Sequence, residues 1–335
     1  MGGRATKAVA LLLPVAILAG VGTTVGFRNP FGSSPAGHHR GHARATARKR
    51  PLAKAGTVSQ TPLVGVFEPG LPGPWAKVTA FAKATGVTPR LVLTYSGWRV
   101  PFRYGFAKTA EAHGAELLVQ MQPWQTPMSA IAAGKYDGYL RSYAQSVRRF
   151  GGPVVIGFAH EMNGTWYPWG YTHESAASFV AAWRHIVTVF RSQGATNVTW
   201  LWTIGGAGTG PPKSYWPGRK YVTWVGVDGY YMKPTWRFSK VSGTVINEVR
   251  TFTQAPILLA EDGIGQMAGQ AKTLPNLFAG MKRDHLLGLV WFDVHQCCGV
   301  RHQDWALHGD KALAAFKQGI LALREDNAAK PPRRG

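Results

Sequence analysis

Eight short apolar runs that alternate with helical patterns constrain the fold of this chain more than any other feature. The runs are rich in Val, Leu, Ile and aromatic residues and lack polar alternation, which is typical of strands covered on both faces. Several of the segments between them have helical spacing and end at a glycine, a common helix stop. The runs lie at residues 63–67, 91–95, 117–121, 154–159, 198–203, 224–228, 257–261 and 287–292. Strands that alternate with helices over this length predict a (β/α)8 barrel at residues 57–327.

Two other architectures are less consistent with the sequence. An open, doubly wound sheet would fit the same alternation, but no GxGxxG run opens a helix after the first predicted strand. A solenoid would need a repeat of fixed period, and the sequence has none. The barrel therefore remains the expected fold class, α/β.

The first 56 residues have a different composition from the rest. Arg4 and Lys7 precede a run without charges, so residues 1–27 are predicted to be a signal peptide or a membrane anchor. Residues 28–56 are basic and poor in large apolar side chains, which predicts a disordered linker. Residues 328–335 are expected to form a disordered basic tail. The protein is thus predicted to be secreted or anchored to the outer face of the cytoplasmic membrane.

Net charge and cysteine content limit the kinds of binding partner and metal site that the sequence predicts. The chain has 38 Lys and Arg against 16 Asp and Glu, for a net charge of +22, which favours anionic partners. Because the predicted signal would export the protein, we expect the basic linker to contact an anionic envelope surface. We do not expect nucleic acid as a partner. The adjacent Cys297 and Cys298 could form a strained disulfide or remain two thiols, and no Cys/His spacing indicates a zinc site. We expect a monomer without metal or other cofactor.

Two carboxylates occupy positions where a barrel of this kind carries its chemistry, the C-terminal ends of the strands. Glu161 follows the fourth run and Glu261 ends the seventh. Two carboxyl groups above one mouth can cleave a glycosidic bond, with retention at a separation of about 5–5.5 Å and inversion at about 6.5–9.5 Å. The sequence leaves this distance open.

Three motifs carry a resemblance to a known family. The runs "FAHEMNGTWYPWG", "WVGVDGYY" and "ILLAEDGIG", in this order, resemble the signatures of glycoside hydrolase family 26. That family contains β-mannanases together with some β-glucanases and xylanases on a (β/α)8 barrel, and its members are retaining enzymes. The resemblance implies that Glu161 is the proton donor and Glu261 the nucleophile.

Further site residues follow from the same resemblance and from position. Trp166 resembles a tryptophan beside the scissile bond, and Tyr230 a tyrosine that hydrogen-bonds the nucleophile. His160 is expected to contact substrate or Glu161. Asn163 lies in the same run and is included among the predicted substrate contacts, as are Trp124 and Trp291, which lie at or just beyond strand ends. For these two tryptophans, sugar stacking and core packing remain alternatives.

The substrate is left open between β-mannan and β-glucan. Many mannanases of the family carry a histidine at the end of the third strand, where this chain has Gln122. The aromatic set around Glu161 would desolvate its carboxyl and keep it protonated. We therefore predict a retaining endo-β-glycosidase that acts on a β-linked polysaccharide. The alternative is a non-catalytic carbohydrate-binding protein on the same barrel.

Overall fold

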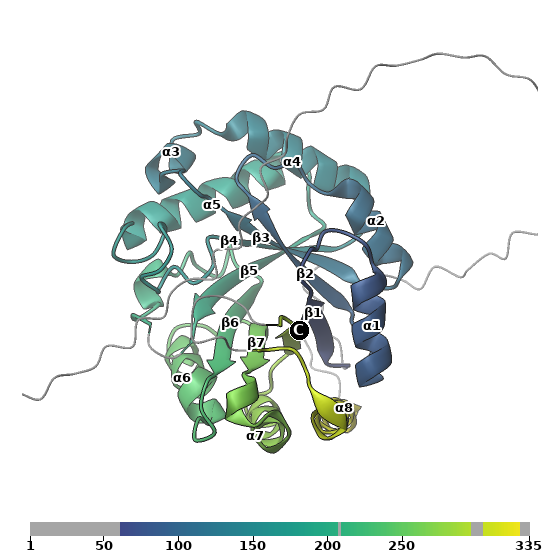
Figure 1. Ribbon diagram of the computed structural model, residues 1–335. Helices are drawn as coiled ribbons and strands as arrows, with labels where there is room; N and C mark the ends of the chain where they lie inside the picture. The colour runs from purple at the N-terminus through teal and green to yellow at the C-terminus, as the bar shows by residue number, and fades with distance from the viewer. Residues whose placement is uncertain (1–60, 207–208, 296–303, 329–335) are drawn as a thin grey trace, which may run out of the picture.

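Eight parallel strands form a closed barrel in the order of the chain (Figure 1). The computed structural model describes residues 61–206, 209–295 and 304–328. Strand β1 pairs with β8 along its whole length, from Leu63 opposite Gly288 to Phe67 opposite Phe292, and this pairing closes the barrel. The predicted (β/α)8 fold is confirmed. The strands are β1 (Leu63–Phe67), β2 (Leu91–Gly97), β3 (Glu116–Gln122), β4 (Val154–Phe158), β5 (Val198–Gly205), β6 (Trp224–Tyr231), β7 (Ile257–Ile264) and β8 (Gly288–Phe292).

Helices surround the barrel and cover the outer faces of its strands (Figure 1). Helix α4 shows why they form, because its buried residues recur at helical spacing and its C-cap, Gly151, adopts a left-handed φ of 75°. In α5 the cap residue Ser175 accepts a hydrogen bond from the Ser178 N–H at 3.1 Å. The helices are α1 (Ala76–Thr85), α2 (Tyr104–Ala112), α3 (Met128–Ala132), α4 (Asp137–Phe150), α5 (Ala176–Ser192), α6 (Thr244–Arg250), α7 (Gln270–Arg283) and α8 (Gly309–Ala328).

The inside of the barrel changes character along its axis. Its lower part is apolar and includes Leu91, Leu118 and Trp224. Above this layer the Gln120 side chain crosses β4 and donates a hydrogen bond to Thr203 Oγ1 on β5 at 2.9 Å. Carboxylates and tyrosines follow toward the C-terminal ends of the strands. The interior thus provides an apolar floor beneath a polar mouth.

Strand β7 carries one extra residue at the level where this change occurs. Val227 pairs with Leu259, but the next residue, Asp228, pairs with Glu261, so Ala260 has no partner of its own on β6. Ala260 packs among the residues inside the barrel, and Glu261 also points inward, toward tyrosines of β2 and β6. Regular pairing would place Glu261 opposite Gly229, so the bulge keeps Glu261 opposite Asp228 and lets two consecutive residues, Ala260 and Glu261, face the interior.

Several sequence-based expectations lie outside the described residues. These are the signal or anchor at 1–27, the linker at 28–56, nearly all of the tail at 328–335, and Cys297 with Cys298. Among the residues that the structure describes, none of the helices is long and apolar enough to cross a membrane. The domain boundaries at the two ends of the chain remain predictions.

Candidate active site

A strained backbone segment after β4 carries Glu161. Ala159 and Glu161 both adopt a left-handed conformation, with φ of 48° and 54°, which residues other than glycine rarely adopt. The segment is held on both sides, because the Ala159 N–H donates to Met121 O and the Glu161 N–H to Thr203 O, each at 2.9 Å. Such conformations cost on the order of 1–3 kcal/mol and concentrate at functional sites. The strain turns the Glu161 side chain over the barrel mouth.

Among the residues that the structure describes, the carboxyl group of Glu161 has one hydrogen-bond donor, which comes from the same loop. Trp166 Nε1 donates to Glu161 Oε2 at 2.7 Å. Burial raises the pKa of Glu161, the negative charge of Glu261 raises it further, and the hydrogen bond from Trp166 lowers it. Since the raising effects dominate, this carboxyl group can keep a proton near neutral pH. With Oε2 accepting from Trp166, the proton belongs on Oε1.

The carboxyl group of Glu261 lies between two tyrosines from other strands. Tyr230 on β6 donates to Glu261 Oε2 at 2.7 Å, and the Tyr95 hydroxyl on β2 donates to Oε1. Burial raises the pKa of Glu261, whereas both hydroxyl groups lower it because they stabilise the ionised form. This contact agrees with the prediction that Tyr230 donates a hydrogen bond to Glu261. Tyr95 was not predicted, and the signal that could have found it is its position at the C-terminal end of a strand.

A third acid lies beneath this pair. Asp228 on β6 is 2% exposed and sits opposite Glu261 in the sheet. Burial raises its pKa, and the charges of Glu261 and Glu161 raise it further. Glu161 follows β4 and Glu261 lies near the C-terminal end of β7, so both carboxyl groups are at the same end of the barrel, where the charge of Glu261 raises the pKa of Glu161. The arrangement can therefore hold a proton on one carboxyl group and negative charge on the other.

His160 lies behind the tyrosines. Its side chain is 1% exposed, its Nε2 is 3.1 Å from the Tyr167 hydroxyl, and its ring lies 5.5 Å from that of Tyr95. Burial lowers the pKa of His160 to about 3, so the imidazole is neutral. The residue thus supports the ring of Tyr95, which holds Glu261, and its hydrogen bond goes to Tyr167 rather than to Glu161.

Aromatic residues form one wall of the mouth. Tyr167 and Trp169 stack at 4.4 Å, and Trp124 meets Trp169 edge-on at 4.9 Å. Trp169 is buried and donates to His160 O at 2.7 Å, whereas Trp124 and Trp166 are partly exposed. The two partly exposed rings are the ones placed to meet a ligand, and the two buried rings support them.

Two predicted substrate contacts are corrected by the structure. Asn163 is fully buried, accepts from the Gly205 N–H at 2.8 Å, and donates to Gly205 O at 3.1 Å and to Thr209 Oγ1 at 2.8 Å. It therefore joins the loop after β4 to the one after β5. Trp291 is also fully buried, because its position on β8 faces α8, where its ring lies 5.5 Å from that of Phe316. Both are structural residues.

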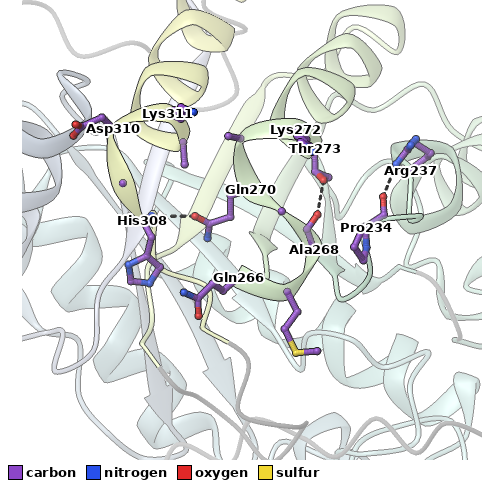
Figure 2. A pocket seen from close by; sticks show the side chains of 15 residues that line it. Pro234, Arg237, Gln266, Ala268, Gln270, Lys272, Thr273, His308, Asp310 and Lys311 are labelled. Carbon is purple, nitrogen blue, oxygen red and sulfur yellow. Dashed lines mark hydrogen bonds between the residues drawn. The ribbon is translucent and has the colours of Figure 1, made fainter.

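A groove lined by residues that follow β6, β7 and β8 lies at the same end of the barrel (Figure 2). It has a volume of about 880 Å³ and lies between the first turns of α7 and α8. Its lining includes Arg237, Met267, Lys272, His308 and Lys311. The groove is thus cationic in part and is separate from the mouth that contains Glu161 and Glu261.

The closed (β/α)8 barrel with an acid pair at β4 and β7 is an arrangement suited to cleavage of a glycosidic bond by two carboxyl groups. Residues 137–264, which contain both acids, match the family model of glycosyl hydrolase family 26. Endoglucanase H of Acetivibrio thermocellus is 27% identical over 73% of this chain. A mannan endo-1,4-beta-mannosidase of Bifidobacterium adolescentis is 31% identical over 30% of it. The chain is therefore similar to members of glycosyl hydrolase family 26.

Solved structures share the fold. The Bacillus subtilis mannanase man26 superimposes with a TM-score of 0.58 at 15% identity, covering 80% of this chain and 85% of that one. A double mutant of the Cellulomonas fimi endo-beta-1,4-mannanase gives a TM-score of 0.60 at 16% identity, covering 78% and 70%. The chain spans only 29% of the length of Endoglucanase H and 11% of that of the mannosidase.

Proposed function

We propose that the protein is a retaining endo-β-glycosidase that cleaves within a β-linked polysaccharide. The observation that carries the proposal is the unequal environment of two acids above one mouth. Glu261 receives two hydroxyl hydrogen bonds, which favour a carboxylate, whereas Glu161 receives one indole hydrogen bond beside a negative charge. A nucleophile and a proton donor need this difference.

In the proposed reaction, the Glu261 carboxylate attacks the anomeric carbon while Glu161 protonates the departing glycosidic oxygen. A covalent glycosyl-enzyme forms and the rest of the polysaccharide leaves. Esterification removes the negative charge of Glu261, which had raised the pKa of Glu161. The pKa of Glu161 therefore falls, and this carboxylate can take a proton from the water that attacks the intermediate. The second step restores Glu261 and releases the sugar with its original anomeric configuration.

We propose β-glucan as the first substrate to test and β-mannan as the second. The longer match is to a relative named as an endoglucanase, whereas the match to the mannosidase covers less of the chain. Gln122 also stands where many mannanases of the family carry a histidine. Its Oε1 accepts a hydrogen bond from Trp124 Nε1 at 3.1 Å, so it fixes one of the partly exposed rings.

The test is release of reducing ends from mixed-linkage β-glucan, β-mannan and xylan, with NMR detection of the first anomer formed. We expect release from glucan or mannan, an internal pattern of cleavage, and a β-anomer as the initial product. An α-anomer would contradict retention. Binding of these polysaccharides without any hydrolysis would favour the carbohydrate-binding alternative, which the family match does not support.

The location remains a proposal that rests on the sequence. We propose that the barrel is secreted or anchored to the outer face of the cytoplasmic membrane and that residues 28–56 contact an anionic envelope surface. A deletion of residues 28–55 should leave kcat unchanged and weaken salt-sensitive attachment to envelope preparations. Equal attachment of the deleted and full-length proteins would contradict the role of the linker.

A further inference from the structure

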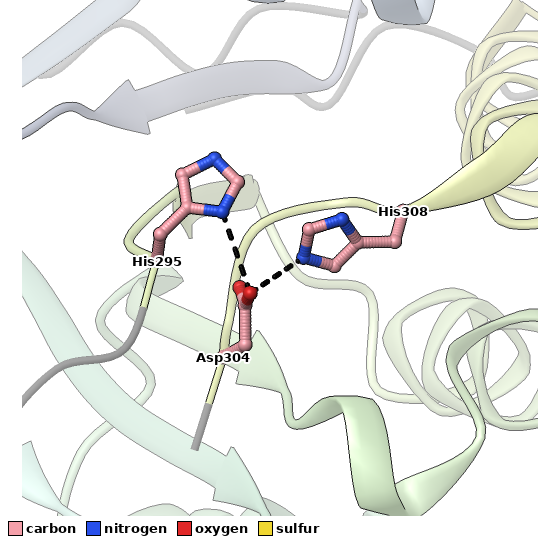
Figure 3. Close-up of side chains that lie close together, drawn as sticks. All are labelled: His295, Asp304 and His308. Carbon is pink, nitrogen blue, oxygen red and sulfur yellow. Dashed lines mark hydrogen bonds and ion pairs between the residues drawn. The ribbon is translucent and has the colours of Figure 1, made fainter. Parts of the chain in front are cut away.

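A cluster of metal-ligating side chains lies in the connection between β8 and α8, outside the proposed catalytic residues (Figure 3). It consists of His295, Asp304 and His308, and one potential ligand atom from each lies within 4.8 Å of the others. Asp304 Oδ2 is 3.3 Å from His295 Nδ1 and 2.8 Å from His308 Nε2. Both imidazoles thus converge on one carboxylate oxygen, as Figure 3 shows.

The carboxylate is oriented for this role by the main chain. The Ala306 N–H donates to Asp304 Oδ1 at 3.1 Å, so Oδ2 is the oxygen directed at the two histidines. Outer hydrogen bonds of this kind fix the orientation of metal ligands. The site therefore has one oriented oxygen and two nitrogens from separate parts of the loop.

The His308 contact has the distance of an interaction but not the direction of a hydrogen bond. Its Nε2 atom is buried and has no hydrogen-bond partner among the residues that the structure describes. Its backbone N–H donates to Gln270 Oε1 at 3.0 Å, which fixes the residue beside the groove of Figure 2. A buried imidazole nitrogen without a hydrogen-bond partner, 2.8 Å from a carboxylate oxygen, is suited to an ion bound by both.

We propose that His295, Asp304 and His308 bind one divalent transition-metal ion of the kind that prefers imidazole, with Zn²⁺ as the first candidate. Two ligands of a tetrahedral zinc ion, each about 2.0–2.1 Å from it, are about 3.3 Å apart, close to the separations found here. His295 is the exposed member, with a side chain 71% accessible, so it can complete the set by rotation. Three protein ligands leave at least one position for water.

The location gives the ion a connection to the catalytic mouth. The Gln266 N–H donates to Asp304 O at 2.9 Å, which joins the loops after β7 and β8. The next residue, Trp305, packs on the ring of Tyr230 at 4.8 Å, and Tyr230 donates to Glu261. An ion on Asp304 therefore stabilises the loop that supports a tyrosine of the site. It takes no part in the proposed reaction.

The experiment uses the full-length protein, without a histidine tag and stripped with a chelator. A background variant carries His38→Ala, His39→Ala and His42→Ala, because these N-terminal histidines could bind metal themselves. Zn²⁺ is titrated by calorimetry, and bound metal is measured after dialysis. We expect about one equivalent in the background protein and a rise in Tm of a few degrees at hundredfold excess over Kd.

Matched variants locate the ion. His308→Ala and Asp304→Asn in that background should lose the equivalent and the Tm rise, whereas His113→Ala should keep both. His113 is a suitable control because it stacks on Trp75 after α2, at the opposite end of the barrel. Absence of stoichiometric binding in the background protein would overturn the proposal, as would equal binding by His308→Ala.

Substitution with Co²⁺ reports the ligand type. A visible ligand-field spectrum without a thiolate charge-transfer band supports the nitrogen and oxygen set. A thiolate band would place the ion on Cys297 or Cys298 and would overturn the assignment. A Tm that depends on pH but not on metal would show that Asp304 only pairs with protonated histidines, which also overturns it.

Discussion

The two sides of the mouth are built in different ways. The surroundings of Glu161 are local, because its donor Trp166 is five residues away and its strained backbone lies in the same loop. The surroundings of Glu261 are assembled from distant strands, since Tyr95 is 166 residues away and Tyr230 is 31 residues away. One side supplies an indole N–H and the other supplies two hydroxyl groups.

The difference shows how one fold separates the properties of two identical side chains. Burial raises both pKa values. The hydroxyl pair then opposes this effect at Glu261, whereas the charge of Glu261 adds to it at Glu161. Activity should therefore require an ionised Glu261 and a protonated Glu161. It should fall at low pH as Glu261 takes up a proton and at high pH as Glu161 loses one.

The largest expected effect comes from removal of the nucleophile. Glu261→Gln should lower kcat by roughly 10⁴-fold or more, because no other described carboxylate has its position between two hydroxyl donors. Initial rates on an activated aryl glycoside measure the loss. Glu325→Gln on the exposed face of α8 is the control and should retain activity. Substantial activity in Glu261→Gln would show that this residue is not the nucleophile.

A smaller and substrate-dependent loss is expected at Glu161. Glu161→Gln should lower kcat/KM on polysaccharide by about 10²–10⁴-fold, since general acid catalysis contributes that much. The loss in kcat/KM should shrink on an aryl glycoside whose leaving group needs no proton. The alkaline limb of the pH profile should disappear. Equal losses on both substrates would contradict the role of proton donor.

The hydroxyl pair should control the acidic limb. Tyr230→Phe removes a hydrogen bond to the Glu261 carboxylate, so the pKa of Glu261 should rise and the acidic limb should move to higher pH. A hydrogen bond to a charged group contributes about 1.5–3 kcal/mol, which predicts a loss in kcat/KM of about 10–150-fold. Tyr95→Phe should act in the same direction. If only the alkaline limb of the pH profile moved, the two hydroxyl groups would not be what sets the pKa of Glu261.

The indole should control the opposite limb. Trp166→Phe removes the donor that lowers the pKa of Glu161, so the alkaline limb should move to higher pH while the acidic limb stays. The loss of activity should be near tenfold if the ring still packs at the mouth. Trp236→Phe, on the loop after β6, is a matched control because its ring is partly exposed and lies against Lys240. The measurement is kcat/KM as a function of pH for the wild-type protein and for both tryptophan variants.

The smallest effect on chemistry and the clearest effect on stability are expected at Asn163. Asn163→Ala leaves the buried Gly205 N–H without its acceptor, which costs about 1–3 kcal/mol in the free energy of unfolding. Denaturant titration measures this cost. KM should change little, because the side chain is fully buried. A raised KM with unchanged stability would restore the prediction that Asn163 binds substrate.

The same contrast explains what the sequence could predict. The strands were identified because continuous apolar runs are typical of a barrel covered on both faces, and Glu161 stood out within one local motif. Tyr95 could not be found in this way, since its role depends on a partner that only barrel closure brings near. Trp291 was misassigned because position at a strand end does not say which face a side chain occupies. The bulge at Ala260 had no signal, because short apolar strands do not reveal their register.

That extra residue in β7 has a consequence for altering the enzyme. Alternation alone would allow an inward Glu261 even if Ala260 were deleted, so such a chain could still close its barrel. The glutamate would then follow Leu259 directly and would still lie opposite Asp228, as it does now. Its two oxygens would therefore stay near the level of the tyrosine hydroxyl groups. The pairing of β7 with β6, and not the number of residues in β7, thus sets the height of this carboxyl group at the mouth.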